Sequence, residues 1–488
     1  MLFTSLEFFG FLLLALLIAA GLRGAQRGLW LLAASWVFYG LDQPAHLIFL
    51  GAVTTVVLGC IQALDHSARP GARRLSLTLG LLLLLGALLV FKFYDFGASQ
   101  FESWLVSNGR PGARLPRLGL TAPAGFSFYV FSGASLLIDR YAGRVAQPTG
   151  WVSGAVYLAW FPKILAGPIE RATTFLPQLS RPTACDPRAV VQGLQLIGWG
   201  LIKKVVIADN LAPLVDHGFK IVAYASPVEL LCSAYFFAFQ IYGDFSGYTD
   251  VALGVSLLFG FRLAENFRRP YLSRSTAEFW GQRWHISLSR WFRDYLYIPL
   301  GGSRTGRLRQ YLNLMLVFVV SGLWHAGLGY GVGWTFLVWG ALNGAYQWVG
   351  LATRGLWARA AARLPRLSTS GTLAVARIVF TFHLILVSWV FFRAKSVGDG
   401  ALMLQKIATH ALELPSIVLA YPFTADQGLA FALIAFLLAV ELIDERRPVL
   451  ERIAALPLAL RWAIWYLGFF VLLTLGRWQT TEFIYMQF

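Results

Sequence analysis

The stretch Leu75–Phe91 reads LSLTLGLLLLLGALLVF and carries no charged side chain. It belongs to a longer apolar run, 75–94, in which Lys92 is the only charged residue. A helix needs about 20 mostly apolar residues to cross the hydrocarbon core of a bilayer. This run therefore predicts a membrane-spanning helix.

Similar runs recur along the whole chain. By the same length criterion the sequence predicts roughly 10 to 13 membrane segments. We expect an all-α, multi-pass integral membrane protein whose 488 residues form a single polytopic domain. Shorter apolar stretches at 29–41, 125–138 and 151–167 are further spans or re-entrant pieces. The stronger candidates are 4–22, 44–63, 75–94, 189–208, 228–243, 311–325, 332–350, 373–392, 428–443 and 459–476.

The composition supports a membrane protein and excludes a water-soluble one. Hydrophobic residues make up 57% of the chain and charged residues only 13%, whereas average soluble domains have about 25% charged residues. The formal net charge of +17 is the excess of Lys and Arg typical of cytoplasmic loops that set orientation. Cys60, Cys185 and Cys232 lie far apart in the sequence, so we expect neither a disulfide nor a metal site.

The segment 276–300 has the periodicity of an amphipathic helix. At about 100° per residue, Trp280, Trp284 and Trp291 fall on one arc, and most of the polar residues occupy the other half. Such a helix lies along the membrane surface or dips into the core. His285 sits on the border between the two faces. It is either an ordinary boundary residue of a structural helix or a functional group.

Residues 262–309 form the most basic part of the chain. They carry ten arginines and no lysine against three acidic residues, a local net charge of +7. A loop that touches anionic lipid would explain this excess. The alternative is a docking surface for a phosphorylated cofactor or an acidic carrier protein, because guanidinium groups suit phosphate better than ammonium groups do. The candidate donor-binding residues are Arg283, Trp284, Arg290 and Arg293.

A second histidine lies at the end of an apolar run, in the motif Ser321-Gly322-Leu323-Trp324-His325. An ionisable residue inside membrane segments is costly and is therefore a functional hypothesis. A neutral histidine accepts a proton near neutral pH and can serve as a general base. The alternative is a histidine that donates one hydrogen bond between helices.

Two carboxylates, Asp244 and Asp250, lie in a short polar stretch between apolar runs. Six positions apart, they face different directions on a continuous helix. Gly243 and Gly247 suggest instead an irregular or tightly packed backbone. Together with Asp294, we expect these carboxylates to form buried polar structure that holds helices in register. Their candidate partners are Arg262, Arg268, Lys203 and Lys204.

Several short motifs can be compared with known families. They are Gly167-Pro168-Ile169, Ile202-Lys203-Lys204, Asp244–Tyr248, Glu265-Asn266-Phe267, Pro270-Tyr271, Arg283–Ser289, Arg293–Gly302, Gly322–His325 and the C-terminal Phe483–Phe488. Together they resemble the membrane-bound O-acyltransferase family, in particular its bacterial polysaccharide branch, which includes alginate O-acetyltransferases. The similarity spans most of the chain. Ala326 stands where a glycine often follows the histidine, and Gly281-Gln282 replace a more basic pair.

The resemblance implies a ring of membrane helices around a tunnel that joins the two faces of the membrane, with a catalytic core at about 160–350. The family's essential histidine falls on His325 and its second motif histidine on His285. His325 would be the general base for an acceptor hydroxyl. His285 would orient the thioester or stabilise charge on its carbonyl oxygen.

The sequence thus favours an O-acetyltransferase of the bacterial inner (cytoplasmic) membrane that moves acetyl groups from cytoplasmic acetyl-CoA for an exported polysaccharide such as alginate. Acetyl-CoA is a substrate, and we expect no permanently bound cofactor or metal, because the sequence contains no P-loop, HExxH or Cys/His cluster. The expected partners are the bilayer, a periplasmic or membrane-anchored acetyltransferase and, indirectly, the polysaccharide, but no nucleic acid. Two alternatives are an acyltransferase fed by an acyl carrier protein and a non-catalytic transporter or flippase for a lipid-linked glycan.

Overall fold

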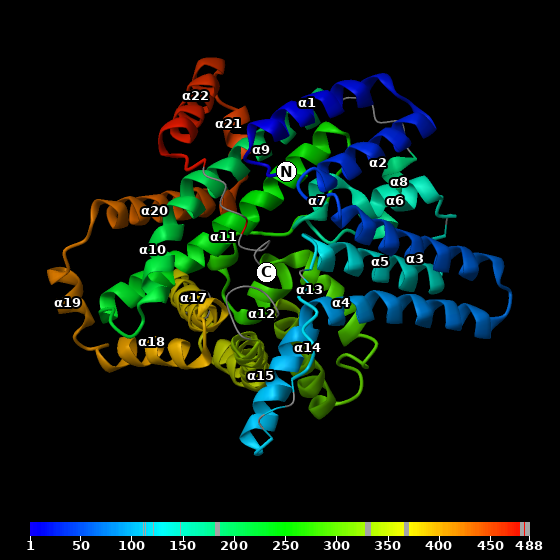
Figure 1. The fold of residues 1–488 in the computed structure, drawn as a ribbon. Helices are drawn as coiled ribbons and strands as arrows, with labels where there is room; N and C mark the ends of the chain where they lie inside the picture. The colour runs from blue at the N-terminus through cyan, green and yellow to red at the C-terminus, as the bar shows by residue number, and fades with distance from the viewer. Residues whose placement is uncertain are drawn as a thin grey trace. The chain divides into compact units, whose positions relative to one another are not determined.

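Helices form all the regular secondary structure of the described residues (Figure 1). The computed structural model describes residues 1–488 except 111, 113, 121, 147, 181–185, 327–332, 366–369, 479–482 and 484–488. The chain divides into two compact units. Unit 1 comprises Met1–Gly200 and Tyr248–Ala264, and unit 2 comprises Leu201–Gly247 and Glu265–Phe488. The all-α fold expected from the sequence is confirmed.

In unit 1, small residues let neighbouring helices approach closely. A Cβ atom on Gly80 of α4 would lie 2.8 Å from Leu137 of α5, and one on Gly154 of α6 would lie 2.4 Å from Leu58 of α3. The predicted segment 151–167 is not one helix but breaks at Trp160, between α6 and α7. The helices are α1 (Leu6–Gly21), α2 (Gly24–Gly40), α3 (His46–His66), α4 (Pro70–Ser107), α5 (Phe126–Tyr141), α6 (Trp151–Ala159), α7 (Phe161–Ile164), α8 (Ala172–Leu179) and α9 (Pro187–Leu201).

Unit 2 holds the remaining helices, and α11 continues from it into unit 1. They are η1 (Ile202–Ala208), α10 (Asp209–Lys220), α11 (Pro227–Leu258), η2 (Pro270–Leu272), α12 (Thr276–Glu278), η3 (Phe279–Arg283), α13 (Ile286–Phe292), η4 (Arg293–Tyr297), α14 (Arg307–His325), α15 (Trp334–Arg363), α17 (Gly371–Arg393), α18 (Val397–Thr409), α19 (Leu414–Ala420), α20 (Ala425–Arg446), α21 (Val449–Ala454) and α22 (Leu458–Leu475). The segments η1, η3 and η4 are π-helical, and η2 is a 3₁₀ turn.

Helices occupy each of the stronger predicted spans. Among the described residues, six helices are both long and apolar enough to cross a membrane, and α1 is a shorter apolar helix. The protein is therefore a multi-pass membrane protein. The single domain, the tunnel and the total number of spans stay predictions. The six are His46–His66, Pro70–Ser107, Pro187–Lys220, Gly371–Arg393, Ala425–Arg446 and Leu458–Leu475.

The backbone around Gly243 is tightly packed rather than irregular. Helix α11 runs unbroken through Gly243 and Gly247. A Cβ atom on Gly243 would lie 3.0 Å from the carbonyl oxygen of Lys203 in η1.

The π-helical segment η1 also contacts the C-terminal part of the chain. Because a π turn leaves a carbonyl outside the α-helical pattern, the oxygen of Val205 accepts a hydrogen bond from the backbone N–H of Arg477 at 2.9 Å.

The prediction of one continuous amphipathic helix over 276–300 is wrong. The segment begins with α12 and η3, breaks at Trp284 and His285, and resumes as α13 and η4. His285 adopts a left-handed backbone conformation, with φ of 43° and ψ of 52°. Periodicity assigns residues to faces of one helix and carries no signal for such a break. Of the three tryptophans on the predicted arc, Trp284 and Trp291 are buried and Trp280 is partly exposed.

Candidate active site

His325 is the last residue of α14, and its position is fixed by close contact between α14 and α15. A Cβ atom on Gly322 would lie 2.4 Å from the carbonyl oxygen of Phe336, and one on Gly340 would lie 2.5 Å from that of Phe318. Only glycine allows the two backbones to approach this closely, as in other membrane helix pairs with small residues at the contact. The contact fixes the end of α14, where the predicted base lies, against the first turns of α15.

Aromatic rings surround the imidazole of His325, which is 4% exposed. Trp324 lies 4.6 Å from it between ring centroids, Phe392 5.2 Å, Trp339 5.3 Å and Phe336 6.3 Å. Such walls make the histidine a basic group among apolar side chains. The structure thus places the predicted general base among buried aromatic rings.

His285 is buried in the same unit and is held by Asn266. Its Nδ1 atom lies 3.1 Å from Asn266 Oδ1. Its ring meets Phe245 edge-on at 4.7 Å and stacks on Phe267 at 6.3 Å. Burial lowers the pKa of His285 to about 3, so the ring is neutral near neutral pH. Asn266 is fully buried, and the sequence reasoning gave it no role of its own.

The two histidines belong to one cluster of aromatic side chains. Trp284, the neighbour of His285, packs against Trp389 of α17 at 5.0 Å. Trp389 in turn contacts Phe392 at 5.2 Å, and Phe392 contacts His325 at 5.2 Å. One continuous cluster of aromatic side chains therefore includes residues of the 265–285 segment, α14 and α17. The sequence placed both histidines in a catalytic core but gave no sign that α17 would join them.

The predicted donor-binding residues do not form one surface. Trp284 is buried in the aromatic cluster. The Arg283 side chain is only 13% exposed and forms ion pairs with Glu278 at 2.7 Å and Glu445 at 2.8 Å. Arg290 and Arg293 are exposed. Only these two arginines of the set present guanidinium groups at the surface of unit 2.

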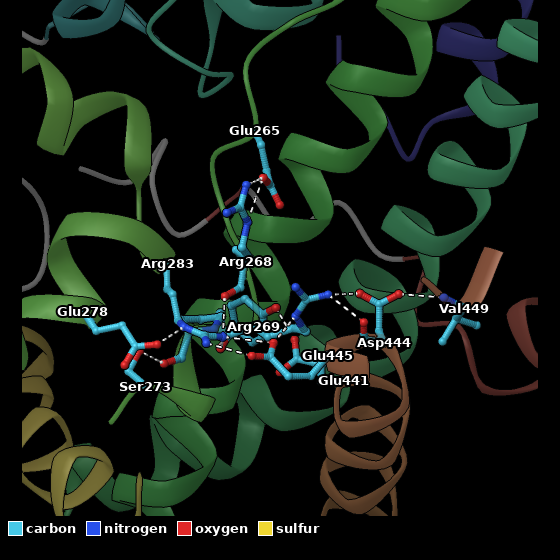
Figure 2. A network of polar contacts seen from close by, with 12 residues as sticks. Glu265, Arg268, Arg269, Ser273, Glu278, Arg283, Glu441, Asp444, Glu445 and Val449 are labelled. Atoms are coloured by element: carbon cyan, nitrogen blue, oxygen red, sulfur yellow. Dashed lines mark hydrogen bonds and ion pairs between the residues drawn. The ribbon is translucent and has the colours of Figure 1, made fainter. Parts of the chain in front are cut away.

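An ion-pair network ties the site to the end of α20 (Figure 2). Glu445 contacts both Arg269 and Arg283, and Arg269 also pairs with Asp444. Arg269, like His285, is a non-glycine residue with φ of 43°. Such conformations cost energy and persist where the surroundings hold them. The sequence reasoning missed these acids, although they directly follow the predicted span 428–443.

Backbone hydrogen bonds join the segment that carries Arg269 to the segment that carries His285. Arg268 N donates to Arg283 O at 2.9 Å, and Ile286 N donates to Asn266 O at 2.9 Å. Arg269 and His285, the two residues with left-handed backbone conformations, thus each lie next to a residue that forms one of these bonds. The network in Figure 2 and these bonds together hold the turn that carries His285.

Asp244 belongs to a buried triad of charged side chains. Lys204 Nζ lies 2.6 Å from Asp244 and 2.9 Å from Asp209, and all three side chains are at most 6% exposed. Lys204 is one of the four partners considered from the sequence. Asp294 instead pairs with Arg293, and Asp250 belongs to unit 1. Removing one partner of a buried pair is strongly destabilising, which supports a structural role for the triad.

Tyr242 and Glu441 form a further buried polar contact, in which the tyrosine hydroxyl donates to the carboxylate. Phe483, at the start of the C-terminal motif, lies 4.6 Å under Lys204 Nζ. Residues 484–488 of that motif and Cys185 lie outside the described residues.

The large groove of unit 1 contains none of the predicted catalytic or donor-binding residues, although Arg262 lines it. It has a volume of about 1440 Å³ and lies between the start of α2, the start of α6 and the end of α11. Within the described part of the chain, no three His, Cys, Asp or Glu side chains lie close enough together to hold a metal ion.

Comparison with known proteins identifies similar chains. Residues 146–393 match the model of the membrane-bound O-acyltransferase family. A probable alginate O-acetylase of Azotobacter vinelandii is 37% identical over 83% of this chain and 80% of its own. A peptidoglycan O-acetyltransferase of Helicobacter pylori is 34% identical over 77% of this chain and 73% of its own. A teichoic acid D-alanyltransferase of Bacillus subtilis is 24% identical over 58% of this chain and 72% of its own.

Proposed function

We propose that this chain, which belongs to the membrane-bound O-acyltransferase family, moves acetyl groups from cytoplasmic acetyl-CoA across the membrane for O-acetylation of an exported polysaccharide such as alginate. The chain is an O-acyltransferase with a multi-pass helical fold. Relatives named as alginate and peptidoglycan O-acetyltransferases support the acetyl group and a glycan as its destination. The bacterial inner membrane is the proposed location, because it separates cytoplasmic thioesters from exported glycans.

His325 acts as the general base in this proposal. It takes the proton of the acceptor hydroxyl while that oxygen attacks the thioester carbonyl, and a tetrahedral intermediate forms. The intermediate breaks its C–S bond, and the imidazolium returns the proton to the departing thiolate. Such catalysis contributes about 10²–10⁴-fold. The observation that carries the proposal is the burial of His325 among aromatic rings, which would protect a thioester from water.

His285 is the second histidine of the proposed mechanism. It shares one aromatic cluster with His325 through Trp284, Trp389 and Phe392. Its ring is held in place by Asn266. These contacts support a role in orienting the reacting groups rather than in taking the proton of the acceptor.

A separate periplasmic or membrane-anchored acetyltransferase would complete the reaction on the polysaccharide. The longest polar stretch of the sequence is 262–310, and it belongs to unit 2 from Glu265 onward. It does not resemble a glycan-binding domain. A long polysaccharide also cannot thread a passage sized for an acetyl group. We expect contact with the partner to be modest in area and transient.

A carrier-protein donor is the second candidate. Arg290 and Arg293 are exposed and would suit an acidic carrier protein, and one relative is named as a teichoic acid D-alanyltransferase. A non-catalytic transporter is disfavoured, because the matched family consists of acyltransferases.

The discriminating experiment offers the purified protein acetyl-CoA and an acyl carrier protein thioester in turn. Release of free CoA by the wild-type protein supports the proposal. Consumption of the carrier thioester alone supports the second candidate. Failure to consume either thioester, with a small hydroxyl acceptor present, contradicts both.

A further inference from the structure

The side-chain oxygen of Asn266 is surrounded by hydrogen-bond donors. Ser287 N lies 3.2 Å from Oδ1, Ser287 Oγ lies 2.9 Å from it, and His285 Nδ1 lies 3.1 Å from it. The backbone oxygen of Asn266 also accepts from Ile286 N at 2.9 Å. One fully buried residue therefore contacts both the backbone and the ring of the His285 turn.

These contacts determine which nitrogen of His285 carries the proton. The backbone N–H of Ser287 can only donate, so the atom of Asn266 that faces it must be the amide oxygen. An amide oxygen can only accept, so His285 Nδ1 must be protonated to hydrogen-bond with it. A neutral imidazole carries a single N–H, and its lone pair therefore lies on Nε2. Burial keeps the ring neutral near neutral pH by lowering its pKa to about 3.

This tautomer changes what His285 can do for a thioester. Negative charge that develops on the carbonyl oxygen is stabilised by a hydrogen-bond donor. Nε2 of His285 has no proton to donate, so of the two roles considered from the sequence only orientation through an accepted hydrogen bond remains. The donor to the carbonyl oxygen would then be another group near His325.

Trp339 has such a donor. Its indole is 1% exposed and lies 5.3 Å from the imidazole of His325, with the ring planes at 86°. Its Nε1 has no hydrogen-bond partner within the part of the chain that the structure describes. A buried donor without an acceptor is costly and calls for an explanation. An acceptor supplied by the substrate would satisfy it.

The neighbouring indole shows the contrasting arrangement. Trp280 packs against Trp339 at 5.4 Å between ring centroids. Its Nε1 donates to Asn343 Oδ1 at 2.9 Å. Among the described residues, the indole N–H of Trp280 thus has an acceptor and that of the adjacent Trp339 has none.

We propose that the indole N–H of Trp339, and not His285, stabilises the negative charge on the thioester carbonyl oxygen during acyl transfer. The inference rests on the proposed function, because it concerns the same attack on the same carbonyl. As the acceptor oxygen bonds to the carbonyl carbon, the C=O π electrons move onto oxygen and accept the hydrogen bond from Nε1. When the C–S bond breaks, the carbonyl re-forms and the sulfur leaves as thiolate.

Phenylalanine substitutions test the proposal, because they keep an aromatic ring and remove the N–H. Trp339→Phe should lower kcat by about 10²–10³-fold, with little change in KM and in thermal stability. Trp280→Phe is the matched control. It leaves Asn343 without a donor, so it should lower the melting temperature while kcat stays near the wild-type value. The proposal is wrong if Trp339→Phe keeps wild-type kcat, or if both variants lose activity only in proportion to stability.

A second measurement examines His285 without reference to activity. Solid-state nuclear magnetic resonance of protein labelled with ¹⁵N-histidine distinguishes protonated from unprotonated ring nitrogens, and His285→Gln identifies the relevant signals by difference. We expect Nδ1 to be protonated and Nε2 unprotonated near neutral pH. A protonated Nε2 would overturn the argument. Kinetic measurements use whichever thioester the wild-type protein consumes, so failure of the proposed function appears separately as a wild type that consumes none.

Discussion

The imidazole of His325 stands edge-on to the indole of Trp339, with ring centroids 5.3 Å apart. Their helices, α14 and α15, approach so closely that the Cα atom of Gly340 lies 3.4 Å from the position of a Cβ atom on Gly322. The distance between the proposed base and the proposed donor therefore depends on two glycines that take no part in the chemistry.

Gly340→Ala should destabilise the protein and lower its activity. The new methyl group would lie 2.5 Å from the carbonyl oxygen of Phe318, so α14 and α15 would have to separate, at a cost of about 1–3 kcal/mol. Gly350→Ala on the same helix is the control. No described residue lies within 4 Å of its added Cβ, and alanine there should stabilise by up to about 1 kcal/mol. Thermal unfolding in detergent measures both. Equal melting temperatures would contradict the packing argument.

Asn266→Ala should impair turnover more than binding. Without the amide oxygen, His285 loses the contact that fixes its tautomer and orientation, and we expect kcat to fall by up to about 10²-fold. Ser287→Ala removes the hydroxyl that donates to the same oxygen but leaves the Ser287 backbone N–H in place. Its kcat should stay close to that of the wild type. Steady-state kinetics that show equal losses for the two variants would assign Asn266 a purely structural role.

Substitution of the three candidate donor-binding arginines should have two different effects, one on acetyl-CoA affinity and one on thermal stability. Replacing Arg290 and Arg293 together with Gln should raise the KM for acetyl-CoA more than it lowers kcat, because both residues are exposed. Added salt should act similarly, since it screens exposed charges beyond about 8 Å at physiological ionic strength. Arg283→Gln should instead lower thermal stability, because its guanidinium pairs with Glu278 and Glu445. An unchanged KM in the double variant and in high salt would remove Arg290 and Arg293 from donor binding.

Hydrophobic length and composition were enough to predict the helical membrane fold. The apolar run 373–392 lies in α17 almost as predicted, because spanning a bilayer fixes the length of such runs. The run 75–94 lies in α4, but that helix continues to Ser107 and has 38 residues. The pairing of Asp244 with Lys204 was among the alternatives that charge alone suggested.

The geometry around His285 was not predictable in the same way. Its left-handed conformation depends on Asn266, nineteen positions earlier in the chain, and periodicity within one segment contains no such information. Glu445 is 162 positions from Arg283, so their ion pair depends on how α20 folds back. The proposed role of Trp339 likewise rests on an indole N–H that has no acceptor among the described residues, which only the folded structure reveals.

Reconstitution in liposomes tests the central claim most directly. Acetyl-CoA with a labelled acetyl group is supplied on the cytoplasmic side of the protein, and the partner acetyltransferase with candidate polysaccharide is supplied on the other side. His325→Ala, checked for normal insertion and purification, is the matched control. The account predicts labelled polysaccharide with the wild-type protein and the partner together, and none with His325→Ala or without the partner. Labelled polymer formed by His325→Ala at more than about a tenth of the wild-type rate, or by the wild-type protein alone, would contradict it.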